Sequence, residues 1–181
     1  MSDHGVSSSA NVREALDGYL RENGFTWEGY DAKWTDASFF GVRFRVPNTR
    51  RHRWSIMLHD LHHVATGYGT DLVGEGEISL WELRRGLRGL DPYVASIVAA
   101  GALMGVALAP TRALAAWRVS GRAHASLFAR VRTQAEYEAL LAGTVAELRA
   151  ALGVPEGGVA RHPRRLHAYA PRGTAAATAG T

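Results

Sequence analysis

The chain has 181 residues, enough for one domain with a substantial hydrophobic core. It contains no cysteine, which excludes a disulfide framework and a thiolate metal site. The formal net charge of +4 at pH 7 equals the contribution of Arg161, Arg164, Arg165 and Arg172, because the rest of the chain has as many acidic as basic side chains. This balance gives no basic surface for nucleic acid, and we expect no nucleic-acid partner.

The N-terminal segment, residues 1–10, is polar and rich in serine, and we expect it to be disordered. It has neither the apolar core of a secretory signal nor the arginines of a mitochondrial presequence, which favours a cytoplasmic protein. A folded domain then begins at Asn11, where Glu14 follows at the spacing of a capping box. Apolar side chains at helical spacing extend this first helix to Gly24.

The next segment, residues 25–47, is rich in aromatic side chains. Apolar side chains alternate with Gly41, Arg43 and Arg45 in its second half, a period of two that predicts an extended segment. The aromatic side chains either pack into the core or form a lid over a ring-shaped ligand.

A helix over residues 50–66 carries the strongest functional pattern in the chain. His59 and His63 are four residues apart, so they share one helix face about a turn apart. Gly67 ends the helix and allows the chain to bring Glu75 back to the same place. Two histidines and a carboxylate suit zinc, iron or manganese and leave coordination positions open for a substrate. The alternative is a polar helix face followed by an ordinary glycine turn.

Two further polar residues lie beside this pair. Asp60 is about 100° around the helix from His59, so it either completes the coordination shell of the ion or acts beside it as a catalytic base. His62 is about 60° from His59 and is a candidate outer-sphere or spare ligand. Asp60 in the base position also suggests a metal-dependent hydrolase, although such helices ordinarily carry the longer glutamate there.

The rest of the chain predicts more helices, over residues 75–89, 91–109, 111–131 and 133–153. The segment from Tyr93 to Ala109 is uncharged and rich in small residues, which predicts a helix buried on all sides or a groove for a lipid tail. Residues 156–181 are rich in Gly, Pro, Arg and Ala, and we expect a disordered basic tail. The predicted fold is all-α: a single domain of about six helices over residues 11–155, with an aromatic-rich extended segment near its N-terminus.

The pattern His59-Asp60-x-x-His63, followed after eleven residues by Glu75, resembles the signature of the Coq four family, coenzyme Q biosynthesis protein four. Weaker similarity lies in Ala116-Trp117-Arg118 and in residues 148–154. Twenty of the 21 basic residues are arginine, and the chain is rich in alanine and glycine, which indicates a bacterial homologue.

The resemblance implies a divalent ion, zinc before iron or manganese, held by His59, Asp60, His63 and Glu75, with Asp60 as the catalytic residue. It implies a metal-dependent enzyme of the lyase type in ubiquinone or related quinone biosynthesis, removing the C1 carboxylate from a prenylated 4-hydroxybenzoate, with oxidation. The partners would be a hydrophobic quinone-like molecule, other biosynthetic enzymes and the inner face of the membrane. The alternative is a non-catalytic scaffold that binds quinone or lipid.

Overall fold

The computed structural model describes residues 6–39, 42–121 and 125–162, and within these ranges helices dominate. The elements in chain order are α1 (Val12–Asn23), the 3-10 helix η1 (Trp27–Asp31), β1 (Trp34–Phe39), β2 (Val42–Pro47), α2 (Arg50–Thr66), α3 (Leu72–Arg85), α4 (Pro92–Leu108), α5 (Pro110–Ser120), α6 (Leu127–Arg130), α7 (Gln134–Ala142) and α8 (Val145–Leu152). The prediction of a predominantly helical, all-α fold is therefore confirmed. Among the described residues, no helix is both long enough and apolar enough to cross a membrane.

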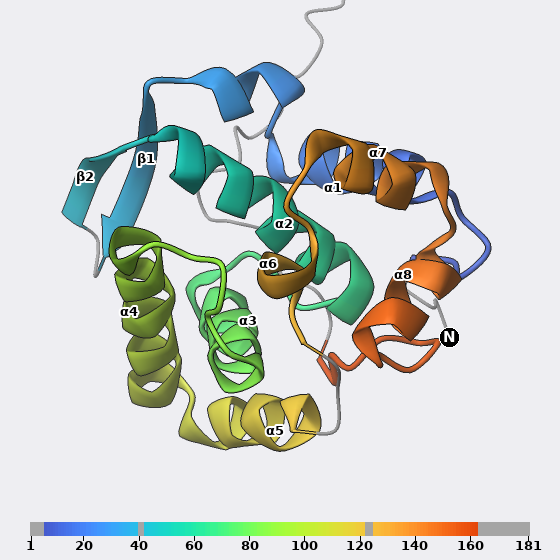
Figure 1. Cartoon of the computed structure of the whole chain (residues 1–181). Helices are drawn as coiled ribbons and strands as arrows, with labels where there is room; N and C mark the ends of the chain where they lie inside the picture. Colours follow the sequence, from blue (N-terminus) through green and yellow to red (C-terminus); the bar gives the residue numbers. More distant parts are fainter. Residues whose placement is uncertain (1–5, 40–41, 122–124, 163–181) are drawn as a thin grey trace, which may run out of the picture.

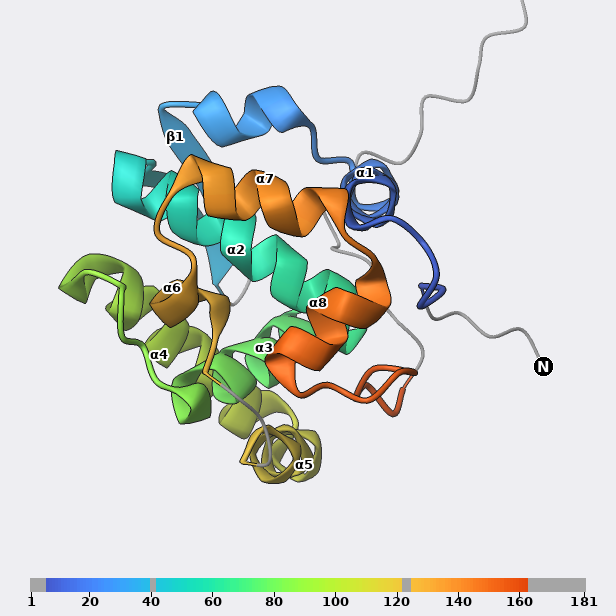
Figure 2. The same ribbon diagram turned by 45° about the vertical axis from the view of Figure 1, so that its right-hand side comes forward.

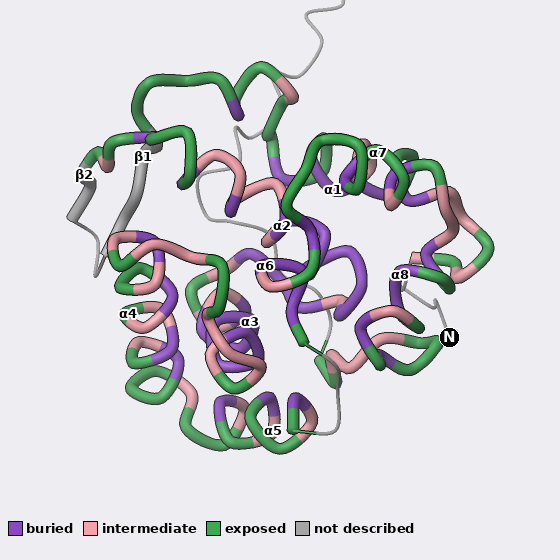
Figure 3. Tube along the Cα trace, viewed as in Figure 1, coloured by how far each residue is buried: buried purple, intermediate pink, exposed green. Residues whose placement is uncertain are grey.

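Helix α2 runs through the middle of the molecule (Figure 1). Helices α1, α7 and α8 lie on one side of it and α3, α4 and α5 on the other, an arrangement that the rotated view shows again (Figure 2). Every residue from 60 to 66 is buried, and this half of α2 is the purple centre of Figure 3. The histidine helix therefore passes through the core, where polar side chains need partners.

The two helices that carry the metal pattern begin and end at clear signals. The Thr49 side chain accepts a hydrogen bond from the His52 amide at the start of α2, and Gly67 ends the helix with φ of 82°. These bounds match the predicted helix over residues 50–66. Helix α3 starts three residues earlier than predicted, because the Asp71 side chain caps it by accepting from the Gly74 amide. Glu75 consequently lies in the first turn of α3, where a carboxylate is stabilised by the helix dipole.

The number of helices differs from the prediction because two predicted helices are each divided. The segment 111–131 separates into α5 and α6, with the first helix ending at Gly121. The segment 133–153 separates into α7 and α8 at Gly143, whose backbone is extended. Thr144 and Glu147 then form a capping box at the start of α8. The sequence analysis did not identify it because the apolar residues on both sides continue at helical spacing.

The prediction that the uncharged helix is buried on all sides is wrong. Helix α4 buries one face against α3, where a side chain added at Gly76 would come within 2.3 Å of the Gly105 Cα atom. Its other side is open, with Leu103 72% and Val106 50% exposed. The small residues thus allow close backbone contact on one face. The apolar side chains of the other face have no partner within the described chain.

Strands β1 and β2 form an antiparallel hairpin, with Trp34 opposite Pro47 and Phe39 opposite Val42. Residues 40 and 41, and the side chains of residues 35–44, lie outside the described part of the chain. Of the described aromatic residues in the segment 25–47, Tyr30 is buried in the core and Trp27 packs against it, whereas Trp34 is exposed. The side chains of Phe39, Phe40 and Phe44 lie outside the described residues, so the choice between core aromatics and a lid is settled only in part.

The segments 6–10 and 156–162, near the two ends of the chain, contact the body beyond the predicted boundaries of 11 and 155. The Ala10 carbonyl accepts from the Val145 amide at 2.9 Å. Near the other end, the amides of Val159 and Ala160 donate to the Thr66 carbonyl at 2.9 and 3.1 Å. The packed body therefore includes residues 6–10 and 156–162, and the remainder of the two predicted disordered ends, residues 1–5 and 163–181, lies outside the described residues.

Candidate metal centre

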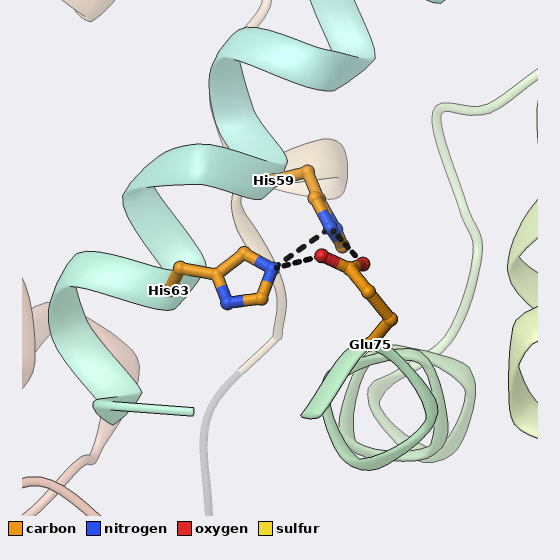
Figure 4. Close-up of side chains that lie close together, drawn as sticks. All are labelled: His59, His63 and Glu75. Atoms are coloured by element: carbon orange, nitrogen blue, oxygen red, sulfur yellow. Dashed lines mark hydrogen bonds and ion pairs between the residues drawn. The ribbon is translucent and has the colours of Figure 1, made fainter. Parts of the chain in front are cut away.

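Three of the four predicted metal ligands meet between α2 and α3. His59 and His63 project from successive turns of α2 toward Glu75 (Figure 4). The two imidazole Nε2 atoms are 3.1 Å apart, His59 Nε2 lies 3.3 Å from Glu75 Oε2, and His63 Nε2 lies 3.4 Å from Glu75 Oε1. Among the described residues this trio can hold a metal ion, since its ligand atoms all lie within 4.8 Å of one another.

These separations match the ligand spacing around a small divalent cation. Ligands at the Zn–N and Zn–O distances of about 2.0–2.2 Å in a tetrahedral site lie roughly 3.3–3.6 Å from one another, close to the 3.1–3.4 Å seen here. The geometry therefore suits a three-ligand site with at least one further coordination position.

The second nitrogen of each histidine is held by an acceptor. The His63 Nδ1–H donates to the Tyr68 carbonyl at 3.1 Å, and the His59 Nδ1–H donates to the Glu82 carboxylate at 2.8 Å. With the proton on Nδ1, the Nε2 atom of each imidazole faces Glu75 and is the nitrogen that could bind an ion. Nδ1 partners of this kind are typical of metal-binding histidines.

Glu82 is the buried residue of the candidate site that the sequence analysis did not single out, because glutamates on helices ordinarily face solvent. It is fully buried, and its Oε1 accepts from both His59 and His62. The available signal was its spacing: seven residues after Glu75, it lies on the same face of α3 two turns further along.

His62 is a buried link between helices. Its Nδ1–H donates to Glu82 at 2.7 Å, and its Nε2 accepts from the Leu127 amide at the start of α6 at 3.0 Å. Both nitrogens are thereby used, and burial lowers the pKa of this imidazole and keeps it neutral. His62 is thus linked to His59 through Glu82, by two hydrogen bonds that share one carboxylate oxygen.

Asp60 differs from the prediction. Its two oxygens accept from the hydroxyls of Tyr19, at 3.1 Å, and Tyr30, at 2.5 Å, and it is outside the trio that can hold an ion. The reason is its position about 100° around α2 from His59, which faces it toward α1 and η1 instead of α3. Because the Tyr19 ring stacks on His63 with centroids 5.6 Å apart, Asp60 contacts the metal site through Tyr19.

The charges in the site favour a cation. Burial opposes ionisation of Glu75, but the adjacent His63 and His59 hold the pKa of this carboxyl well below its usual range. Burial likewise opposes protonation of His59, but Glu82 and Glu75 raise the pKa of this imidazole well above its ordinary value. Two ionised carboxylates thus surround His59, so a positive ion bound here is stabilised.

The site opens to solvent on one side. The His63 side chain is fully buried, whereas the side chains of His59 and Glu75 are 23% and 31% exposed. A structural zinc site is ordinarily closed by four protein ligands, while a catalytic one keeps a position for water or substrate. Three ligands and partial exposure correspond to the second kind.

No protein-family model matches this chain, and no curated protein or solved structure is similar to it. The functional argument therefore depends on the residues of the site and on the pattern that connects them.

Proposed function

We propose that this protein binds one divalent metal ion, zinc, at His59, His63 and Glu75, and acts as a metal-dependent decarboxylase in quinone biosynthesis. The observation that carries the proposal is the convergence of three side chains: the two Nε2 atoms lie 3.1 Å apart, each lies 3.3–3.4 Å from one oxygen of Glu75, and both imidazoles are oriented through Nδ1. The spacing of His59-Asp60-x-x-His63 and Glu75, which resembles the Coq four signature, directs the proposal to that pathway.

The proposed substrate is a prenylated 4-hydroxybenzoate-type ring. A bound divalent ion supplies Lewis acidity, which stabilises negative charge on substrate oxygens. The exposed side of His59 and Glu75 admits the ring carboxylate, while buried His63 holds the inner side of the site closed. The outer partners Glu82 and Tyr68 hold the imidazoles in one orientation, so little reorganisation is needed when substrate binds.

The proposed conversion breaks the bond between C1 of the ring and its carboxylate, releasing carbon dioxide, and forms a bond between C1 and a hydroxyl oxygen. Dioxygen is the oxidant. One oxygen atom enters the product and the other leaves as water; two electrons come from an external reductant, and three protons are taken up, one of them balancing the charge of the carboxylate. Zinc has no redox chemistry, so these electrons do not come from the site itself.

An apolar surface supports a prenylated substrate. Large apolar side chains are exposed on α4 and α5: Ile97, Leu103, Val106, Leu108, Leu114 and Trp117. The outer side of α4 is exposed along its length in Figure 3. Surfaces of this kind on a soluble fold contact lipid or another apolar partner. We propose that this face contacts the prenyl chain or the inner membrane surface that contains it, with the protein in the cytoplasm.

The same surface favours one alternative, a non-catalytic scaffold that binds a quinone-like lipid and its biosynthetic enzymes. The hydrolase alternative is less well supported, because both oxygens of its candidate base, Asp60, are bonded to Tyr19 and Tyr30.

The test is incubation of zinc-loaded protein with a short-chain prenylated 4-hydroxybenzoate, dioxygen and a reductant, followed by mass spectrometry. We expect the carboxylate to be replaced by a hydroxyl with wild-type protein and not with His63→Ala. Unchanged substrate in the presence of bound zinc would refute the decarboxylase, and co-purified lipid would then favour the scaffold.

A further inference from the structure

The carboxylate of Glu82 is shared by two imidazoles. Its Oε1 accepts from His59 Nδ1–H at 2.8 Å and from His62 Nδ1–H at 2.7 Å, and all of Glu82 is buried. Its other oxygen, Oε2, has no hydrogen-bond partner within the described chain. Among the described residues, Glu82 forms no ion pair with a lysine or arginine side chain. A buried carboxylate with so few partners needs a compensating positive charge.

The position of Glu82 is fixed from the far side of the site. His62 is itself held by the Leu127 amide, which donates to its Nε2 at 3.0 Å. The ring of His62 also packs between Trp81 and Phe128, with centroids 5.1 and 5.0 Å away. Contacts thus run from α6 through His62 and Glu82 to His59, and they hold the His59 ring in one orientation.

We infer that Glu82 is the positioning residue for the metal ligand His59: it fixes Nδ1 as the protonated nitrogen, directs Nε2 toward the ion, and increases the basicity of the ring. This inference rests on the proposed metal site and deepens it. A carboxylate hydrogen-bonded to a ligand histidine ordinarily raises metal affinity about 10- to 100-fold. Its effect passes through His59, and Glu82 does not touch the ion.

The matched pair of variants is Glu82→Gln and Glu77→Gln. Both remove a buried carboxylate from α3, but Glu77 pairs with Arg112 and is not bonded to a histidine. We expect Glu82→Gln to weaken zinc binding about 10- to 100-fold, and Glu77→Gln to leave it within about threefold. The affinity is measured by competition with a chromogenic chelator, well below the melting temperature of each variant. The visible spectrum of the cobalt-loaded protein is expected to shift in Glu82→Gln alone.

Equal zinc affinity and equal cobalt spectra in the two variants would overturn the role of Glu82. A wild-type protein that binds neither zinc nor cobalt would instead refute the metal site, so the two failures are distinguishable. If Glu82→Gln does not fold, long-range proton–nitrogen NMR of zinc-loaded wild-type protein decides. We expect the proton of His59 on Nδ1 and the metal on Nε2, and the opposite assignment would overturn the inference.

Discussion

The hydrogen bond from Tyr30 to Asp60 gives a direct test of where Asp60 lies. Tyr30→Phe removes a hydroxyl that donates to Asp60 Oδ2 at 2.5 Å and leaves that buried oxygen without this donor. A hydrogen bond to a charged group contributes about 1.5–3 kcal/mol. In a domain of this size each kcal/mol corresponds to about 2–4 °C in melting temperature. We therefore expect Tyr30→Phe to lower the melting temperature by roughly 3–12 °C.

The structure offers a matched control. Tyr137 is also buried, but its hydroxyl has no hydrogen-bond partner within the described residues. Tyr137→Phe should change the melting temperature by less than about 2 °C, because no bond is lost. Both variants are measured by calorimetry, with zinc content determined in parallel and expected to be unchanged. Equal melting temperatures for the two variants would refute the Tyr30–Asp60 bond and would favour Asp60 as a metal ligand, as the Coq four resemblance implies.

The remaining predictions concern metal binding, the chain end and the apolar face. Because the pKa of His59 is raised, its proton competes with the ion. At pH values below the pKa of His59, zinc affinity should fall about tenfold per pH unit. The metal-free protein should lose stability as the pH rises through that pKa. Melting curves with and without zinc test both, and a zinc-induced gain in melting temperature that does not vary with pH would contradict this. Removing residues 156–181 should lower the melting temperature by roughly 4–10 °C by removing the two bonds to the Thr66 carbonyl and the packing of Val159. Removing only residues 163–181 should leave the melting temperature unchanged. Equal decreases in melting temperature for the two truncations, measured by calorimetry, would contradict the docking of residues 156–162 on the body. Leu103→Gln with Val106→Gln should weaken sedimentation with anionic vesicles at least about tenfold, and unchanged sedimentation would refute a lipid-facing α4.

Local sequence signals predicted the metal trio, because the relevant geometry is itself local. The four-residue spacing of His59 and His63 places them on one face, and Gly67 allows the return to Glu75. The helix bounds from Thr49 to Gly67 follow from equally local capping rules. What the sequence could not give was the direction of Asp60, since that depends on which helices pack against each side of α2.

The same reason explains the other differences. Glu82 is polar in a helix, and only the packing of α2 against α3 makes it a buried partner of two histidines. Helix α4 has no charged residue on either face, so charge along the sequence does not distinguish its exposed residues from its buried ones. The break at Gly143 is hidden by apolar residues that continue at helical spacing on both sides.

The central claim is most directly tested by measuring metal content in the wild-type protein and in a His59→Ala, His63→Ala double variant. Both proteins are dialysed against excess zinc and then against metal-free buffer, and zinc, iron and manganese are measured by mass spectrometry of the metals. We predict about one zinc ion per wild-type chain and less than about a tenth of that in the double variant, with helical circular dichroism retained. Equal metal content in the two proteins, or none in either, would contradict a metal site at His59, His63 and Glu75.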